Sequence, residues 1–238
     1  MALAGLSLAA APASAGPPFL TDDPVPTDRA HWEIYNFALG SQAAGALSGQ
    51  AGLDLNYGAA KDLQLTAVIP MDYDAGGRTN LGLGDIELAA KYRLLHQDEN
   101  GLMPDVAIFP RVFVDSADKR FGSARTSLFL PVWVGKDWGS WSVFGGGGYQ
   151  INPGPGQRDF WQFGAAVTHA LNDRLTLGLE AFRFGRESDD GAPVTLVNLG
   201  LLYRFTPHWS LLAAGGPGVE NASREGNYNF YVALKADY

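Results

Sequence analysis

Short segments in which apolar and polar side chains alternate recur along nearly the whole chain. Residues 85–93 are the clearest example, because Ile86 and Leu88 fall on one face while Glu87 and Lys91 fall on the other. A period of two is typical of a β-strand that has one apolar and one polar face. The pattern therefore predicts an all-β chain built from antiparallel strands.

The alternation predicts twelve strands, separated by turn-forming residues. They are expected at residues 31–39, 52–58, 62–70, 83–94, 105–115, 126–136, 140–150, 159–169, 174–184, 194–205, 208–215 and 227–238. Away from the N-terminus, no uncharged apolar run approaches the roughly 20 residues that a membrane-spanning helix needs. If the chain enters a membrane, it must do so with strands.

The predicted connections alternate in length. Long ones are expected at 40–51, 71–82, 116–125, 151–158, 185–193 and 216–226, and short ones at 59–61, 137–139, 170–173 and 206–207, with 95–104 as the exception. Outer-membrane barrels have short periplasmic turns and longer external loops. We therefore expect a closed antiparallel transmembrane β-barrel in a bacterial outer membrane, surrounded by lipid.

Aromatic residues and the last strand favour the same fold. Aromatic residues near strand ends predict two interfacial girdles, formed by Tyr57, Tyr92, Trp141, Tyr203, Trp209 and Tyr238 at the periplasmic rim and by Tyr149 and Trp161 at the outer rim. Apolar residues at every second position up to Tyr238 resemble the C-terminal signal that the outer-membrane insertion machinery reads. A secreted β-sandwich also has alternating strands, but it explains neither the loop asymmetry nor the girdles.

The N-terminal residues divide into two segments before the predicted barrel at 31–238. Residues 1–15 read as a signal peptide, with an apolar stretch before Ala13-Ser14-Ala15, although they carry no Lys or Arg. Residues 16–30 contain four prolines and are expected to form a periplasmic tether or a plug rather than a strand. Phe19, Asp22 and Asp23 are the candidate plug residues.

Composition excludes several classes of function. The net charge of −8, without a clustered basic stripe, argues against binding nucleic acid. The absence of cysteine suits a protein that crosses an oxidising periplasm while unfolded. No His/Cys spacing typical of zinc and no phosphate-binding loop is present, so we expect neither a metal nor a cofactor.

If the apolar face of each strand points to lipid, the polar residues point into the lumen. This predicts lumen positions for Asp54, Asn56, Gln64, Asp85, Glu87, Lys91, Arg93, Arg111, Glu180, Asn198, Arg204, Asn229, Lys235 and Asp237. Glu87 and Arg111 are expected to pair at mid-height. The pair is either a structural brace, which is favoured, or part of a constriction that selects solutes.

The candidate channel residues form two sets. Those expected to line the lumen or its constriction are Glu87, Arg111, Glu180, Asp85, Lys91 and Asn198. Arg93, Arg204 and Lys235 lie near the periplasmic ends of their strands and predict a basic inner rim. Such a rim would bind Asp22 and Asp23 or weakly favour anions.

Two strands depart from the simple pattern. The four glycines at 145–148 weaken strand pairing unless they serve barrel curvature or seat a plug or loop. In strand 31–39, a lumen-facing Glu33 would place Asn36 against lipid and Tyr35 and Phe37 inside. We therefore expect a β-bulge that switches the faces.

A lipid-acting hydrolase is the weakest alternative function. Only His208 and Ser210 lie two residues apart on one predicted strand face, and no third group is evident to orient the histidine. A catalytic role is therefore not favoured.

Several stretches together resemble a known family, the outer-membrane transporters grouped under the phenol meta-pathway. They are residues 16–23 (GPPFLTDD), 82–85 (GLGD) followed by 91–93 (KYR), 145–149 (GGGGY) and 152–156 (NPGPG). The resemblance covers nearly the whole expected mature chain. It implies a membrane barrel and a route for small hydrophobic or aromatic compounds, without assigning any substrate contact.

Together these observations predict an outer-membrane channel or uptake porin for small solutes. A closed barrel with a structural or adhesive role and a barrel hydrolase are the alternatives.

Overall fold

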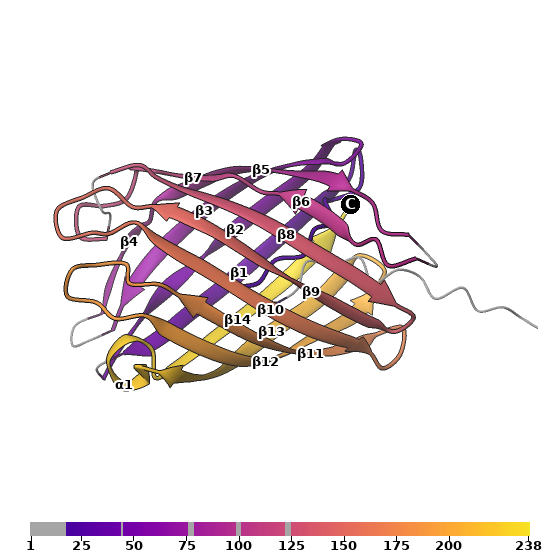
Figure 1. The fold of residues 1–238 in the computed structure, drawn as a ribbon. Coiled ribbons are helices and arrows are strands. Elements are labelled where there is room, and N and C mark those ends of the chain that lie inside the picture. The colour runs from indigo at the N-terminus through magenta and orange to yellow at the C-terminus, as the bar shows by residue number, and fades with distance from the viewer. Residues whose placement is uncertain (1–17, 44, 76–78, 99–100, 122–124) are drawn as a thin grey trace, which may run out of the picture.

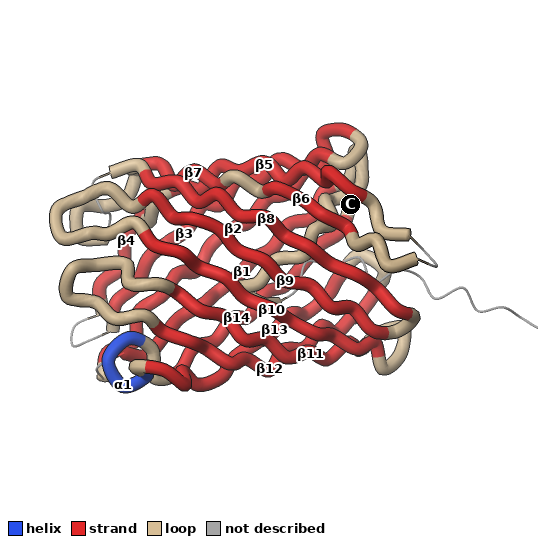
Figure 2. Tube along the Cα trace, in the orientation of Figure 1, coloured by secondary structure: helices blue, strands red, loops and turns tan. Residues whose placement is uncertain are grey.

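The computed structural model describes residues 18–238 apart from 44, 76–78, 99–100 and 122–124, and at 224–225 it describes only the backbone. The predicted signal peptide and the first two residues of the predicted tether lie outside the described residues. Strands make up most of the described chain, and loops and turns join them at the two ends of the molecule (Figure 2).

The strands form one antiparallel sheet that closes on itself (Figure 1). Their bounds are β1 (Trp32–Ala43), β2 (Ala46–Ala60), β3 (Leu63–Asp74), β4 (Asn80–Leu83), β5 (Ile86–Leu95), β6 (Asp105–Ile108), β7 (Arg111–Val114), β8 (Ser127–Trp138), β9 (Trp141–Ile151), β10 (Phe160–Ala170), β11 (Leu175–Phe184), β12 (Val194–Thr206), β13 (Trp209–Glu220) and β14 (Tyr228–Asp237). The first and last strands close the ring, because β1 pairs with both β2 and β14.

Two pairs of these segments are interrupted single strands. β4 and β5 both pair with β3. β6 and β7 both pair with β5 on one side and with β8 on the other. The first interruption falls at Gly84 and Asp85, and the second at Phe109 and Pro110, where proline supplies no N–H to the ladder. The barrel therefore has twelve strands around its wall, and the predicted fold is confirmed.

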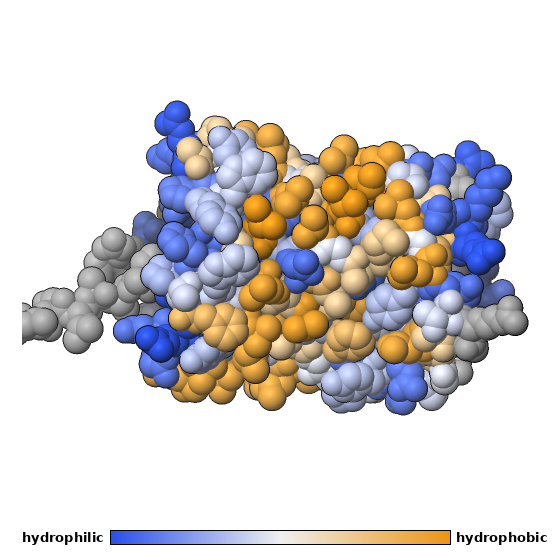
Figure 3. All heavy atoms as spheres, turned by 180° about the vertical axis from the view of Figure 1, so that it is seen from behind, coloured by the Kyte–Doolittle hydropathy of each residue, from blue (hydrophilic) through white to orange (hydrophobic). Residues whose placement is uncertain are grey.

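The outer surface carries a broad hydrophobic band with hydrophilic residues toward both ends (Figure 3). Leu65, Leu88, Leu199 and Phe163 are exposed on the outer face of their strands and alternate with lumen-facing residues. Aromatic residues pair near the ends of the wall, as in Trp32 with Tyr57 and Tyr149 with Trp161. This is the surface that a lipid bilayer requires of a barrel.

In the part of the chain that the structure describes, helix is confined to one short segment, α1 (Ala222–Glu225). Across the described residues, no helix has the length and apolar character needed to cross a membrane.

The predicted loop at 40–51 is wrong, because β1 continues to Ala43 and β2 already begins at Ala46. The chain turns tightly at Gly45, which has a φ of 84°. Gly40 and Gly49 face each other in this hairpin, and the Tyr73 hydroxyl donates a hydrogen bond to the Leu39 carbonyl oxygen at 2.9 Å. Gly40 and Gly49 leave room for the Tyr73 side chain, and strand pairing continues beyond the segment in which polarity alternates. Two other predicted loops also begin late, since β3 runs to residue 74 and β13 to residue 220.

The predicted bulge in the first strand is also wrong. The register of β1 with β2 is unbroken from Trp32 to Ala43, so Asn36 is exposed on the lipid side. Tyr35 and Phe37 are buried in the lumen against Leu212. The same register keeps the Glu33 carboxylate inside the barrel, 3.0 Å from Lys235 Nζ, and packs both aromatic rings into the cluster, while one amide faces lipid.

Candidate functional site: the barrel lumen

A segment preceding β1 crosses the lumen, and we call residues 18–30 the lumen segment. The Thr21 amide donates a hydrogen bond to Glu180 Oε1 on β11 at 2.5 Å, and the Thr27 amide donates one to Gln64 Oε1 on β3 at 2.8 Å. β3 and β11 lie on opposite sides of the closed sheet. The segment therefore spans the interior from wall to wall.

Five lumen-facing glycines make room for this segment. A Cβ atom placed on any of them would touch it: Gly58 would meet Asp28, Gly135 would meet Pro24, Gly164 would meet Thr21, and Gly178 and Gly200 would both meet Phe19. Glycine weakens a strand and is used where another backbone or side chain must approach closely. The wall is thus shaped around the lumen segment, and the sequence analysis missed these five positions because single glycines in strands have no distinctive pattern.

The glycine run at 145–148 does not seat the segment. Cβ atoms on Gly146 and Gly148 would meet atoms of β8, including Val132 O and Leu130 O. Gly146 and Gly147 have φ values of 150° and 151°, which side chains rarely adopt. The run therefore serves the shape of the wall beside Trp133, and the plug-seat hypothesis for it is wrong.

Glu87 and Arg111 form the predicted ion pair. Arg111 Nε and Nη2 donate hydrogen bonds to the two carboxylate oxygens of Glu87 at 2.6 and 2.7 Å. The guanidinium also lies over the rings of Phe109 and Phe113, with 5.5 and 5.8 Å to their centroids. Bidentate pairing and ring stacking hold this arginine in one orientation.

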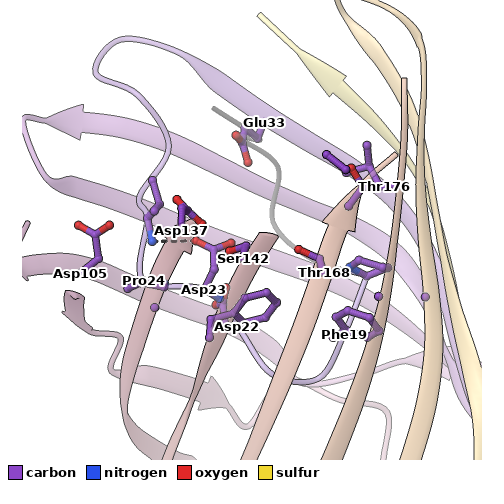
Figure 4. Close-up of a pocket in the computed structure, with 18 of the residues that line it drawn as sticks. Phe19, Asp22, Asp23, Pro24, Glu33, Asp105, Asp137, Ser142, Thr168 and Thr176 are labelled. Atoms are coloured by element: carbon purple, nitrogen blue, oxygen red, sulfur yellow. Dashed lines mark hydrogen bonds between the residues drawn. The ribbon is translucent and has the colours of Figure 1, made fainter. Parts of the chain in front are cut away.

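Lys91 contacts the lumen segment rather than the wall. Its ammonium lies 3.0 Å from Asp22 Oδ1 and donates a hydrogen bond to the Asp23 carbonyl oxygen at 3.0 Å. Figure 4 shows Phe19, Asp22 and Asp23 inside the barrel, with Thr168 on the wall nearby. Burial raises the pKa of the Asp23 carboxyl group to about 7, and Lys91 partly offsets this effect.

Glu180 and Asn198 form a second polar group across the barrel. Asn198 Nδ2 donates to Glu180 Oε2 at 2.8 Å, and Asn229 Nδ2 donates to Asn198 Oδ1 at 2.9 Å. Asp85 is separate from both groups, because its carboxylate accepts hydrogen bonds from the Ser116 and Ala117 amides beside the break after β4. Asp85 therefore braces an outer loop, and the prediction that it belongs to the constriction is wrong.

Wall and turn groups, rather than Asp22 and Asp23, bind the residues of the predicted basic inner rim. Arg93 pairs with Asp62 at 2.9 Å, and Lys235 lies 3.0 Å from Glu33. Arg204 donates to the Asp173 carbonyl oxygen at 3.4 Å. Although burial opposes the change, hydrogen bonds from Arg93 and His96 lower the pKa of Asp62.

A cavity of about 630 Å³ lies between the lumen segment and the wall. It extends from the turn residues Gly139 and Asp173 to Glu87 and Arg111. Its lining includes eight carboxylate side chains and five basic ones, so it is acidic in balance. The acidic excess contradicts the expectation of an anion-favouring rim.

Aromatic side chains fill two further regions of the lumen. One cluster contains Phe109, Phe129, Trp133 and Phe182, and the other contains Tyr35, Phe37, Leu212 and Ala233. The sequence analysis missed them because it assigned apolar residues to the lipid side. In β8 both faces are apolar, and alternation cannot tell the lumen face from the lipid face.

The residues of the hydrolase hypothesis do not form a catalytic pair. His208 is exposed, and its Nδ1 lies 2.9 Å from the Asp237 carbonyl oxygen, whereas Ser210 is buried on the lumen face. Within the described ranges, no group of three His, Cys, Asp or Glu side chains could hold a metal ion.

A closed twelve-stranded wall with an apolar outer band defines a bacterial outer-membrane β-barrel. Residues 47–236 match the family described as "Putative MetA-pathway of phenol degradation", so the chain belongs to that family. The resemblance inferred from the sequence is confirmed.

Solved structures share the fold at low sequence identity. The COG4313 outer membrane channel from Pseudomonas putida F1 aligns with a TM-score of 0.69 and 16% identity, covering 89% of this chain and 96% of that one. The NanC porin aligns with a TM-score of 0.59 and 12% identity, covering 86% and 98%. The KdgM porin in complex with disordered oligogalacturonate aligns with a TM-score of 0.58 and 10% identity, covering 87% of this chain and 99% of that one. No curated protein sequence matches the chain.

Proposed function

We propose that this barrel is an outer-membrane channel for small solutes that carry an aromatic or other apolar group. The observation that carries the proposal is the pair of buried aromatic and aliphatic clusters inside the lumen. Tyr35 and Phe109 of these clusters line the cavity beside the lumen segment, and apolar contact there would favour rings over strongly hydrated molecules. The similar solved structures include a channel and porins, which supports passage as the general role.

The lumen segment is part of this proposal as a plug. Its hydrogen bonds to Glu180 and Gln64 and its ion pair with Lys91 support this role, because they hold the segment across the lumen. Glu87 and Arg111 line the cavity beside it, and we propose that they act mainly as a brace. Displacement of the plug would join the cavity to the rest of the lumen.

Liposome swelling tests the proposed solute class. Purified protein, either intact or lacking residues 18–28, is reconstituted and challenged with phenyl glucoside or the smaller methyl glucoside. We expect faster swelling with phenyl glucoside, and faster swelling after deletion of the plug. A simple water-filled pore would instead favour the smaller sugar.

A matched pair of variants assigns the preference to the lumen. Phe182→Leu alters the buried aromatic cluster, whereas Phe163→Leu makes the same change at an exposed position on the lipid face. Phe182→Leu should lower the ratio of the two swelling rates and Phe163→Leu should not. Liposomes that stay tight even after removal of residues 18–28 would support the closed structural or adhesive barrel.

A further inference from the structure

Lys91 differs from the other lumen cations in the origin of its partner. Arg111, Arg93 and Lys235 pair with the carboxylates of Glu87, Asp62 and Glu33, which belong to the wall or its turns. The ammonium of Lys91 pairs with Asp22 of the lumen segment and binds the neighbouring Asp23 carbonyl oxygen. Its carboxylate partner therefore leaves when the segment leaves.

A vacated Lys91 would need another anion. Its side chain is 5% exposed with the lumen segment in place, so departure of Asp22 leaves the ammonium without its carboxylate partner and open to an anion in the cavity. Removal of Asp22 and Asp23 also takes two carboxylates away from the cavity lining, which makes the remaining site less acidic. A solute carboxylate could then replace Asp22 on the ammonium.

Aromatic groups beside Lys91 define the rest of the ligand. The Lys91 ammonium lies 5.0 Å from the centroid of Phe109, which belongs to the cluster that also contains Trp133 and Phe182. The lumen segment presents a similar combination, because Asp22 binds Lys91 while the Phe19 ring packs against Gly178 and Gly200. A carboxylate attached to an aromatic ring would replace Asp22 on the ammonium and bring its ring to Phe109, in a cavity large enough for a small molecule.

We propose that Lys91 anchors a binding site for aromatic carboxylates, and that the lumen segment occupies this site until such a solute displaces Asp22. The inference rests on the proposed function, since it names one class of solute for the same channel. It predicts that an aromatic anion opens the plug and that a neutral aromatic compound of similar size does not.

Thiol labelling detects the displacement directly. The chain has no cysteine, so Thr21→Cys introduces a single thiol at a position that is fully buried. Labelling of the reconstituted protein by a maleimide is followed with benzoate, with benzyl alcohol or with neither. We expect benzoate to accelerate labelling and benzyl alcohol to leave the rate unchanged.

Charge variants assign the effect to Lys91. In the Thr21→Cys background, Lys91→Met should abolish the benzoate effect, whereas Lys61→Met, which removes the same charge from an exposed turn, should retain it. Benzoate should bind Lys91→Met about 10- to 100-fold more weakly, as expected for the loss of a charged hydrogen bond. Asp22→Asn removes the competing carboxylate from the lumen segment and should tighten benzoate binding by about tenfold.

The inference is overturned if benzoate binds Lys91→Met as well as the parent protein, or if benzyl alcohol accelerates labelling equally. Unchanged benzoate affinity in Asp22→Asn also contradicts it, and this arm does not depend on the folding of the Lys91 variant. Phenyl glucoside has no carboxylate, so its passage tests the proposed function separately. Aromatic-selective swelling without benzoate-driven labelling would reject the inference alone.

Discussion

At the scale of single residues, the lumen charges are held by short, specific contacts. Glu87 is buried and accepts two hydrogen bonds from Arg111, whose guanidinium also stacks on Phe109. Removing either Glu87 or Arg111 would leave the charge of the other one inside the barrel without an opposite charge. The pair therefore orders the wall where β5 meets β7, whether or not a solute is present.

Glu87→Gln should destabilise the barrel by about 1–3 kcal/mol, because Arg111 loses a charged acceptor. The double variant Glu87→Gln, Arg111→Met should recover most of this loss, since it leaves no unpaired charge. The measurement is the temperature at which the folded barrel loses its characteristic gel mobility. A double variant as unstable as the single one would argue against a brace.

In the proposed plug, Asp23 should make docking of the lumen segment depend on pH. Its pKa rises from 3.8 to about 7 because docking buries the carboxyl group, against the opposing effect of Lys91, while Asp22 and Glu33 add to the increase. Docking is therefore strongest when Asp23 is protonated, and it weakens as the pH rises from 3.8 to about 7.

Planar-bilayer conductance should accordingly be lower at pH about 5 than at pH about 8. Asp23→Asn cannot titrate and should reduce this difference, with Asp28→Asn on the same segment as the control. An equally steep pH profile in Asp23→Asn would show that another group governs docking.

At the scale of elements, β1 shows how packing overrides a sequence pattern. Its unbroken register places Tyr35 and Phe37 in the lumen cluster and leaves Asn36 facing lipid. The strand keeps the arrangement that buries the larger side chains. The Asn36 amide, which faces lipid, is the energetic cost of this arrangement.

Asn36→Leu should therefore stabilise the barrel in bilayers by about 1–2 kcal/mol, because it removes an exposed polar group from hydrocarbon. Asn198→Leu is the matched control, and it should destabilise because Asn198 bonds to Glu180 inside the lumen. The unfolding midpoint in denaturant, measured in lipid vesicles, compares the two. Destabilisation by Asn36→Leu would contradict the lipid-facing assignment.

The sequence predicted the strands better than it predicted the lumen. Alternation locates strands such as β5, because Leu88 and Glu87 differ sharply in polarity and a strand separates them onto two faces. It fails for Phe129 and Trp133, whose strand is apolar on both faces. The Glu87–Arg111 pair was predictable from register across one hairpin, whereas the contact of Asp22 with Lys91 joins positions 69 residues apart and no local pattern encodes it.

At the scale of the whole molecule, a closed wall and a segment threaded through it define two separable parts. The wall satisfies its backbone through strand pairing around the ring, as a barrel in lipid must. The lumen segment is held by Glu180, Gln64 and Lys91 and by glycines that admit it. The proposed channel requires that the barrel keep its fold while the segment moves.

A reversible disulfide tests this account most directly. A Cβ on Gly164 would touch Thr21 Oγ1, so cysteines at these two positions are within bonding reach, and the chain offers no competing thiol. In planar bilayers, the oxidised Thr21→Cys, Gly164→Cys protein should conduct least, its reduced form more, and the chain lacking residues 18–28 most. Equal conductance in all three would contradict the proposal that the lumen segment closes the channel.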